Sequence, residues 1–262
     1  MTDRPSPVGL SVPCWRAGEF ASRSEDLDID FAALDTAALG TRLLSACLRD
    51  ADDAPLASHA VARWNVAQRL QGLLAIARSS VGEQLPALAR CTDAECGGQI
   101  ELDLGLRQFE RDAPTQLEWQ APDGTPLRCR LPDTGDLAAW RAHGGDEAWL
   151  ARRLVRLVAG QAPAPDWTFP SAWLAPFAAA LEAADPLTAL TLEVPCPFCE
   201  HPTPVAIDLE ALLLDALRRH QQSVLEEVHR LARAYHWSEA QIVAMPGWRR
   251  RRYLARLQAE FA

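Results

Sequence analysis

Hydrophobic residues in the first third of the chain recur at helical spacing. One series shares a single helical face, at Leu39, Leu43, Leu44 and Cys47. A second series runs from Val61 to Ala77 at intervals of three and four residues, and the Asp-Asp-Ala-Pro run at 52–55 separates the two. We therefore predict two or three helices in a helical N-terminal region, residues 31–90. Residues 1–30 have no sustained period, which indicates an extended N-terminal arm.

The spacing changes from helical to alternating at Cys91. Apolar residues alternate with polar ones over 99–104, and again on both sides of Asp123-Gly124, a dipeptide typical of hairpin turns. A strand, a cysteine pair and a second strand are predicted over 190–209. Between these strands, helical spacing returns at 137–140, 149–158 and 172–181. Residues 91–209 are therefore predicted to form a β core with inserted helices.

The last part of the chain is helical again. Apolar residues from Leu213 to Tyr235 step by three and four along one face, and Ser238 with Gln241 forms a capping-box pattern that begins another short helix. These features define a C-terminal helical segment, residues 210–262. Taken together, the patterns predict an α+β protein that is mainly helical and has a small antiparallel β core.

Four of the seven cysteines form two close pairs, and each pair precedes an alternating strand. The pairs are Cys91 with Cys96, and Cys196 with Cys199. A tight turn with two to four residues between cysteines directs both sulfurs at one point, and two such turns supply the four thiolates of a tetrahedral Zn²⁺ site. We therefore predict that two zinc knuckles share one structural Zn²⁺ per chain and pin the β core.

Two other interpretations of the cysteine pairs stay open: reduced thiols without a metal, and a redox Cys-x-x-Cys at Cys196 and Cys199. A thioredoxin-like motif begins a helix in a βαβ unit, whereas Cys196 lies between two predicted strands. His201 is a candidate to replace one thiolate, although Glu200 and Pro202 beside it favour a surface position. Four protein ligands leave no coordination position for water, so the predicted metal is structural and not hydrolytic.

Composition excludes several classes of protein. The net charge of −9 disfavours a general binder of nucleic-acid backbones, and the absence of lysine excludes a Walker or Schiff-base lysine. Glu226-x-x-His229 matches half of a di-metal helix motif, but no second copy is present. Since no catalytic motif emerges, we predict that the protein is not an enzyme. The three remaining cysteines fit apolar packing positions, at Cys14, Cys47 and Cys129.

Neither a membrane span nor a signal peptide is predicted. No uninterrupted apolar run approaches the roughly 18 residues of a membrane helix, and residues 1–5 lack the features of a signal peptide. We therefore expect a soluble, unexported protein that has no membrane partner.

A basic block near the C-terminus is a candidate docking element. Arg249 to Arg252 lie between Trp248 and Tyr253 in an otherwise acidic chain. This setting favours docking on an acidic protein surface over binding to nucleic acid. Tryptophans in or beside proline-containing segments are further candidates for interface anchors, at Trp15, Trp167 and Trp248.

The run EVHRLARAYHWSEAQI at 227–242, followed by RRRRYL at 249–254, resembles the C-terminal signature of a family of phage-tail proteins related to the T4 bacteriophage baseplate hub protein. The cysteine pair after an N-terminal helical region, the segment RCRLPDTGDL at 128–137 and the second pair before the last helices are similar as well. The resemblance covers roughly residues 32–258, and 227–242 is its most specific part.

This resemblance implies a structural or assembly component of the baseplate of a contractile tail, in a phage, a prophage or a phage-derived injection system. It implies other baseplate or tail proteins as partners, no catalytic residues, and a location in the cytoplasm during assembly or in the phage-like particle. The main alternative is a zinc-ribbon regulator that binds nucleic acid through Arg249 to Arg252. A hydrolase or redox enzyme, which would need a reactive cysteine in the Cys-x-x-Cys, is the third candidate.

Overall fold

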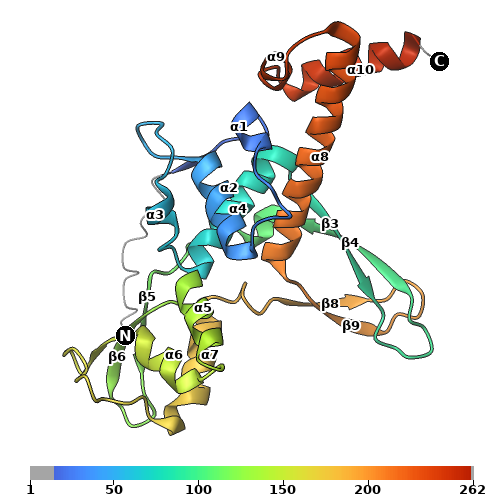
Figure 1. Cartoon of the computed structure of the whole chain (residues 1–262). Coiled ribbons are helices and arrows are strands. Elements are labelled where there is room, and N and C mark those ends of the chain that lie inside the picture. The colour runs from blue at the N-terminus through green and yellow to red at the C-terminus, as the bar shows by residue number, and fades with distance from the viewer. Residues whose placement is uncertain (1–14, 261–262) are drawn as a thin grey trace, which may run out of the picture.

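The computed structural model describes residues 15–260. A helical body forms the centre of the molecule, and three parts extend from it (Figure 1). They are a pair of β-hairpins, an insertion lobe over 116–184, and a C-terminal head over 235–260. The predicted α+β class, with small antiparallel sheets, is confirmed. No helix of the described residues is long and apolar enough to cross a membrane.

Three helices build the body: α2 (Thr36–Cys47), α4 (Val66–Val81) and the N-terminal half of α8 (Leu209–Tyr235). Leucines spaced at three and four residues line their shared core, as the hydrophobic pattern predicts. Gly72 lets α2 approach α4 closely, because a Cβ there would lie 2.4 Å from the Leu44 side chain. The body therefore joins the two ends of the described chain in one core.

The prediction of helix up to residue 90 is wrong at its end. Residues Gln84–Arg90 form strand β3, which pairs antiparallel with β4 (Gln99–Gly105). Leu85 and Ala87 are buried, and their neighbours Gln84, Pro86 and Leu88 are exposed, so the alternation of a strand is present in the sequence. Pro86 lies within this segment and disfavours a helix there.

The described part of the predicted arm is packed on the body and is not extended. Strand β1 (Arg16–Ala17) pairs with β2 (Leu48–Arg49), and the side chains of Phe20 and Ile29 are buried in the body core. The side-chain amide of Gln221 donates to the carbonyls of three residues in this segment, Asp26, Leu27 and Ile29. A prediction based on helical or strand periodicity does not detect such a segment, because its elements are short and irregular. Residues 1–14, with Cys14, lie outside the described residues.

The insertion lobe has its own small core. Its sheet has the order β5 (Gln116–Gln120), β6 (Pro126–Arg130), β7 (Val155–Val158), and the turn at 121–125 confirms the hairpin predicted around Asp123-Gly124. Residues 155–158 were predicted to be the end of a helix, and this prediction is wrong because they form strand β7. Aromatic side chains fill the core, at Trp119, Phe169, Trp173 and Phe177. Trp167 packs against this core, so it is not a free interface anchor.

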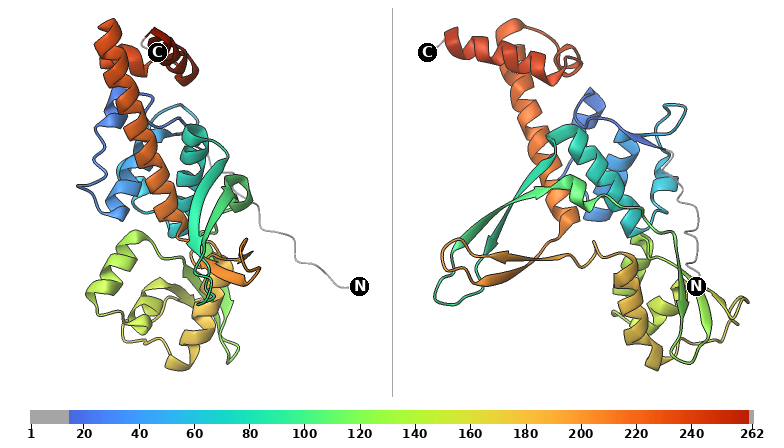
Figure 2. Two further views of the ribbon diagram at one scale, coloured as in Figure 1. Left: turned by 90° about the vertical axis from the view of Figure 1, so that its right-hand side faces the viewer. Right: turned by 180° about the vertical axis from the view of Figure 1, so that it is seen from behind.

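A single long helix connects the body to the head. Strand β9 (Pro202–Ala206) is followed by α8, whose N-terminal half is buried in the body and whose C-terminal end carries α9 (Glu239–Val243) and α10 (Gly247–Glu260) (Figure 2). The capping box predicted at Ser238 and Gln241 is present.

The remaining elements are short or complete the parts already named. They are α1 (Ser24–Leu27), α3 (Ser58–Val61), η1 (Leu106–Phe109), α5 (Thr134–Ala142), α6 (Glu147–Leu154), η2 (Ser171–Trp173), α7 (Leu174–Ala184) and β8 (Thr191–Pro195). Within residues 15–260, strand β8 pairs only with β9, and the two form the second extended hairpin.

Candidate metal centre

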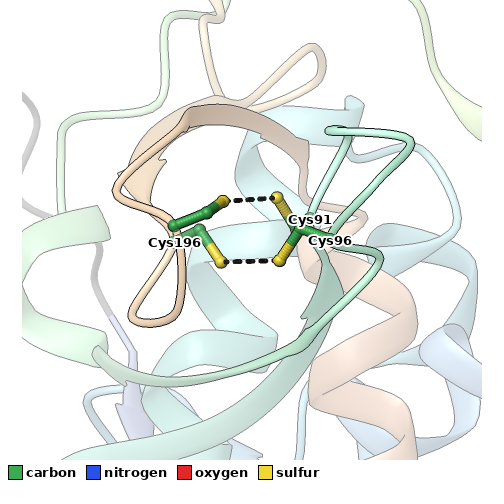
Figure 3. A group of neighbouring side chains, drawn as sticks. Cys91, Cys96 and Cys196 are labelled. Carbon is green, nitrogen blue, oxygen red and sulfur yellow. Dashed lines mark hydrogen bonds between the residues drawn. The ribbon is translucent and has the colours of Figure 1, made fainter.

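The four cysteines of the two pairs meet at the tips of the two hairpins. Cys91 and Cys96 lie in the connection between β3 and β4, and Cys196 and Cys199 lie in the connection between β8 and β9. Figure 3 shows Cys91 and Cys96 directed from one hairpin toward Cys196 on the other. All four sulfurs lie within 4.8 Å of one another, although about 100 residues separate the pairs in sequence. The predicted ligand set is therefore brought together.

The sulfur–sulfur distances fit a tetrahedral metal. The Sγ atoms of Cys91 and Cys199 are 3.6 Å apart, and those of Cys96 and Cys196 are 3.8 Å apart. A tetrahedral Zn²⁺ with sulfur ligands at about 2.3 Å requires sulfurs about 3.8 Å from one another. A disulfide would require about 2.05 Å. The cluster thus has the spacing of a metal site.

Tight turns place two sulfurs on each tip. In the first turn the amides of Cys96 and Gly97 both donate to the Asp93 carbonyl, and in the second the Glu200 amide donates to the Cys196 carbonyl at 2.8 Å. Gly97 and Glu200 both have positive φ, which reverses the chain after the second cysteine of each pair. The four intervening residues of the first pair are therefore compatible with the same arrangement as the two of the second.

Backbone amides stabilise negative charge on the sulfurs. Burial by itself would raise the pKa of Cys196, but hydrogen bonds from the amides of Phe198 and Cys199, with neighbouring thiols, outweigh burial and lower it to about 7. Amide donors of this kind favour a thiolate, which is the form that binds a metal.

Cys199 has the opposite tendency. The His201 amide lowers the pKa of Cys199, but burial and the thiols of Cys96, Cys91 and Cys196 outweigh this effect and raise it to about 12. Several thiolates in one place repel one another, so without a cation the cluster cannot ionise fully. A divalent metal supplies the charge that allows all four sulfurs to be thiolates.

Three further residues complete the centre, and sequence reasoning missed them. The buried Thr203 donates its hydroxyl to the Cys91 sulfur at 3.6 Å. The ring of Phe198 lies against Gly98, where a Cβ would come within 2.6 Å of it. The alternation of a strand puts Thr203 on one face of β9. That this face is directed at the Cys91 sulfur is seen only where the two hairpin tips meet.

The remaining candidate residues lie elsewhere. Among the described residues, the clustered ligand atoms are four sulfurs, and His201 contributes none of them. Glu226 and His229 are not part of any group of three or more metal-ligating side chains in the described chain. Cys47 and Cys129 are buried in separate apolar cores, as predicted, and burial is the main cause that raises the pKa of each thiol to about 12.

The geometry favours a structural metal over a redox pair. Cys196 lies between two strands and not at the start of a helix, and it faces Cys96 of the other hairpin. The apolar cluster at the tips is small, and the hairpins form separate two-stranded sheets. A metal would therefore be the principal link between the two hairpins.

Metal analysis checks this centre directly. Elemental analysis of the purified full chain is expected to give one zinc per chain, because the four sulfurs form one closed tetrahedral set. Exchange with Co²⁺ is expected to give the spectrum of a tetrahedral thiolate complex. Folded protein that contains no metal and has four alkylatable thiols at these positions would contradict the assignment.

No protein-family model, curated protein or solved structure matches the chain. The four cysteines lie close enough together to hold a metal ion.

Proposed function

We propose that the chain is a non-enzymatic structural or assembly component of the baseplate of a contractile tail, held together by a structural zinc ion. The observation that carries this proposal is the head. The two segments that resemble the baseplate family, 227–242 and 249–254, lie on three different helices and pack on one another. A signature whose residues contact one another is the expected result of selection for one structural unit.

A buried ion pair and an aromatic cluster hold the head together. Arg250 is almost fully buried, and it donates to the Glu227 carboxylate at 2.7 Å and to the Met245 carbonyl at 2.7 Å. The rings of Tyr235 and Trp237 stack with centroids 4.6 Å apart, and Tyr253 meets Trp237 edge-on at 4.9 Å. Both contact sets join the end of α8 to α10, so they fix the orientation of the final helix.

The outer face of α10 has the composition of a docking surface. Helix α10 carries five arginines and one glutamate in a chain of net charge −9, and four of these arginines are exposed: Arg249, Arg251, Arg252 and Arg256. Trp248 is 56% exposed, and the Arg252 guanidinium lies 5.3 Å from the centre of its ring. Exposed tryptophan and arginine are the residue types most enriched at binding hot spots. An acidic protein surface is the partner that complements this face.

The cysteine cluster supports a role without catalysis. A metal with four protein sulfurs has no open position for water or substrate, so its contribution is to folding. The proposed partners are other proteins of the tail, and the location that follows is the cytoplasm during assembly or the finished particle.

Trp248→Ala combined with Arg252→Ala is expected to release the chain from tail assemblies. Loss of two adjacent hot-spot side chains costs at least about 2 kcal/mol, or about thirtyfold in affinity. The measurement is recovery of sheath, tube and spike proteins with the tagged full chain from assembly intermediates and from purified particles. Both substituted side chains are exposed, so circular dichroism and melting temperature should remain unchanged.

Arg42→Ala is a matched control, since Arg42 is an exposed arginine on the body helix α2. This variant should retain the tail proteins. Absence of the chain from every intermediate and particle would refute the baseplate proposal. Salt-sensitive retention of DNA or RNA at physiological salt, lost in the double variant, would favour the nucleic-acid-binding alternative instead.

A further inference from the structure

A polar hollow lies where the insertion lobe meets the body. Its volume is about 420 Å³, within the range of small-molecule sites. Residues from the start of α4 and from the lobe line it, and the body and lobe are joined beside it by a hydrogen bond from the Val66 amide to the Pro132 carbonyl. Four of the lining residues are arginines: Arg63, Arg130, Arg153 and Arg156.

Two of these arginines are held in place by a buried carboxylate. The Asp136 side chain is fully buried; Arg130 donates to it through Nη2 at 2.6 Å, and Arg153 through Nε at 2.6 Å. Asp133 lies 3.7 Å from Arg130 and accepts the Asp136 amide as the N-cap of α5. Both guanidinium groups are thus oriented before any ligand arrives, which lowers the entropic cost of binding.

The other two arginines have no such carboxylate. Arg63 and Arg156 are exposed, and neither forms an ion pair with an acidic side chain of the described residues. Asp133 and Asp136 compensate two of the four guanidinium groups, so the hollow retains about two positive charges. The Asn65 side chain is committed, because its Oδ1 accepts from the Gln68 amide and its Nδ2 donates to the Pro114 carbonyl. The guanidinium N–H groups are therefore the charged donors that a ligand would meet in the hollow.

We propose that this hollow binds a small oxyanion with two or more negative charges, a phosphate or a polycarboxylate, between the body and the insertion lobe. Planar guanidinium groups bind such oxyanions through paired N–H donors, which suits arginine better than lysine. The ligand would contact residues of both parts at once: Arg63 belongs to the body, and Arg130, Arg153 and Arg156 belong to the lobe. This inference is independent of the baseplate proposal.

Calorimetric titration of the full chain with inorganic phosphate, and separately with citrate, tests the site at constant ionic strength. Saturable binding near one ligand per chain is expected for at least one of the two probes. Arg63→Gln combined with Arg156→Gln should weaken it by at least about tenfold, since each charged hydrogen bond lost is worth that much in favourable cases. Neither arginine compensates a buried acid, so the double variant should keep its fold.

Arg141→Gln is the matched control, because Arg141 is exposed on α5 of the same lobe and does not line the hollow. This variant should bind as the unchanged chain does. A preference for phosphate or for citrate identifies the group that the site selects, and either preference supports the proposal. Absence of saturable binding with both probes, or equal binding by the double variant and the unchanged chain, would overturn it.

Discussion

Cys196→Ser is expected to remove the metal from the chain and to separate the two hairpin tips. The small apolar cluster at the tips includes Cys196 itself, and the hairpins form separate sheets, so little else joins them. A covalent link that closes a loop of about 100 residues stabilises a protein by roughly 4–5 kcal/mol, and a four-thiolate metal link is expected to do at least as much. For a chain of this length, this loss corresponds to a fall in melting temperature of roughly 10–20 °C.

Metal content and thermal melting of the full chain measure both parts of this prediction. Zinc should fall from one per chain to none, and chelation of the unchanged protein should reproduce the lower melting temperature. Cys47→Ala is the control, because Cys47 is equally buried but lies in the body core, away from the cluster. It should keep its metal. A metal-free Cys196→Ser protein with an unchanged melting temperature would refute the structural role.

Asp136→Asn is expected to destabilise the insertion lobe by about 3–5 kcal/mol, the usual cost of removing one partner from a buried ion pair. The substitution keeps the shape of the side chain but leaves Arg130 and Arg153 without their shared carboxylate. Chemical denaturation with tryptophan fluorescence reports on this lobe, because Trp119 and Trp173 lie in its core. Asp166→Asn, at an exposed position in the same lobe, should have little effect.

The same carboxylate gives the lobe a dependence on pH. Burial by itself would raise the pKa of Asp136, but Arg130, the Asp133 amide and Arg153 outweigh burial and hold it well below its usual range. The lowered pKa means that the stabilisation is fully present above the ordinary aspartate pKa near 3.8 and is lost as the pH falls below it. The unchanged chain should therefore lose stability in acid more steeply than Asp136→Asn. Parallel loss in both proteins would contradict this assignment.

The sequence predicts the parts of this fold that have long, regular periods. The helices α2, α4 and α8 bury one face each, so their leucines recur every three or four residues, and the hairpin at Asp123-Gly124 has both alternation and a turn dipeptide. Strand β3 was missed because its leucines were assigned to the preceding helical series, although Gly82, which ends α4, and Pro86 mark the change. Residues 15–30 are held by scattered contacts to the body, and no periodicity records contacts of that kind.

The metal centre is predictable to the level of its ligands. Paired cysteines identify themselves by spacing, since a turn that directs two sulfurs at one point needs few residues. The groups that support these ligands cannot be identified from spacing in the same way. The hydroxyl of Thr203 becomes a neighbour of the Cys91 sulfur only when the tips meet, because the two residues belong to different hairpins. The anchoring roles suggested for Trp15 and Trp167 fail for a similar reason, because each packs on a core formed by distant residues, and only Trp248 is largely exposed.

The long helix α8 has a mechanical consequence. At 27 residues it is about 40 Å long, and only Ile207 and Asp208 separate it from β9, the strand that leads to the cysteine-bearing tip. The N-terminal half of α8 is packed in the body core, and the head lies at its C-terminal end. The helix is thus a lever whose fulcrum is the body core. Force applied to α10 by a docked partner would reach the body as torque, and the hairpins at the short end of the lever would bear the reaction.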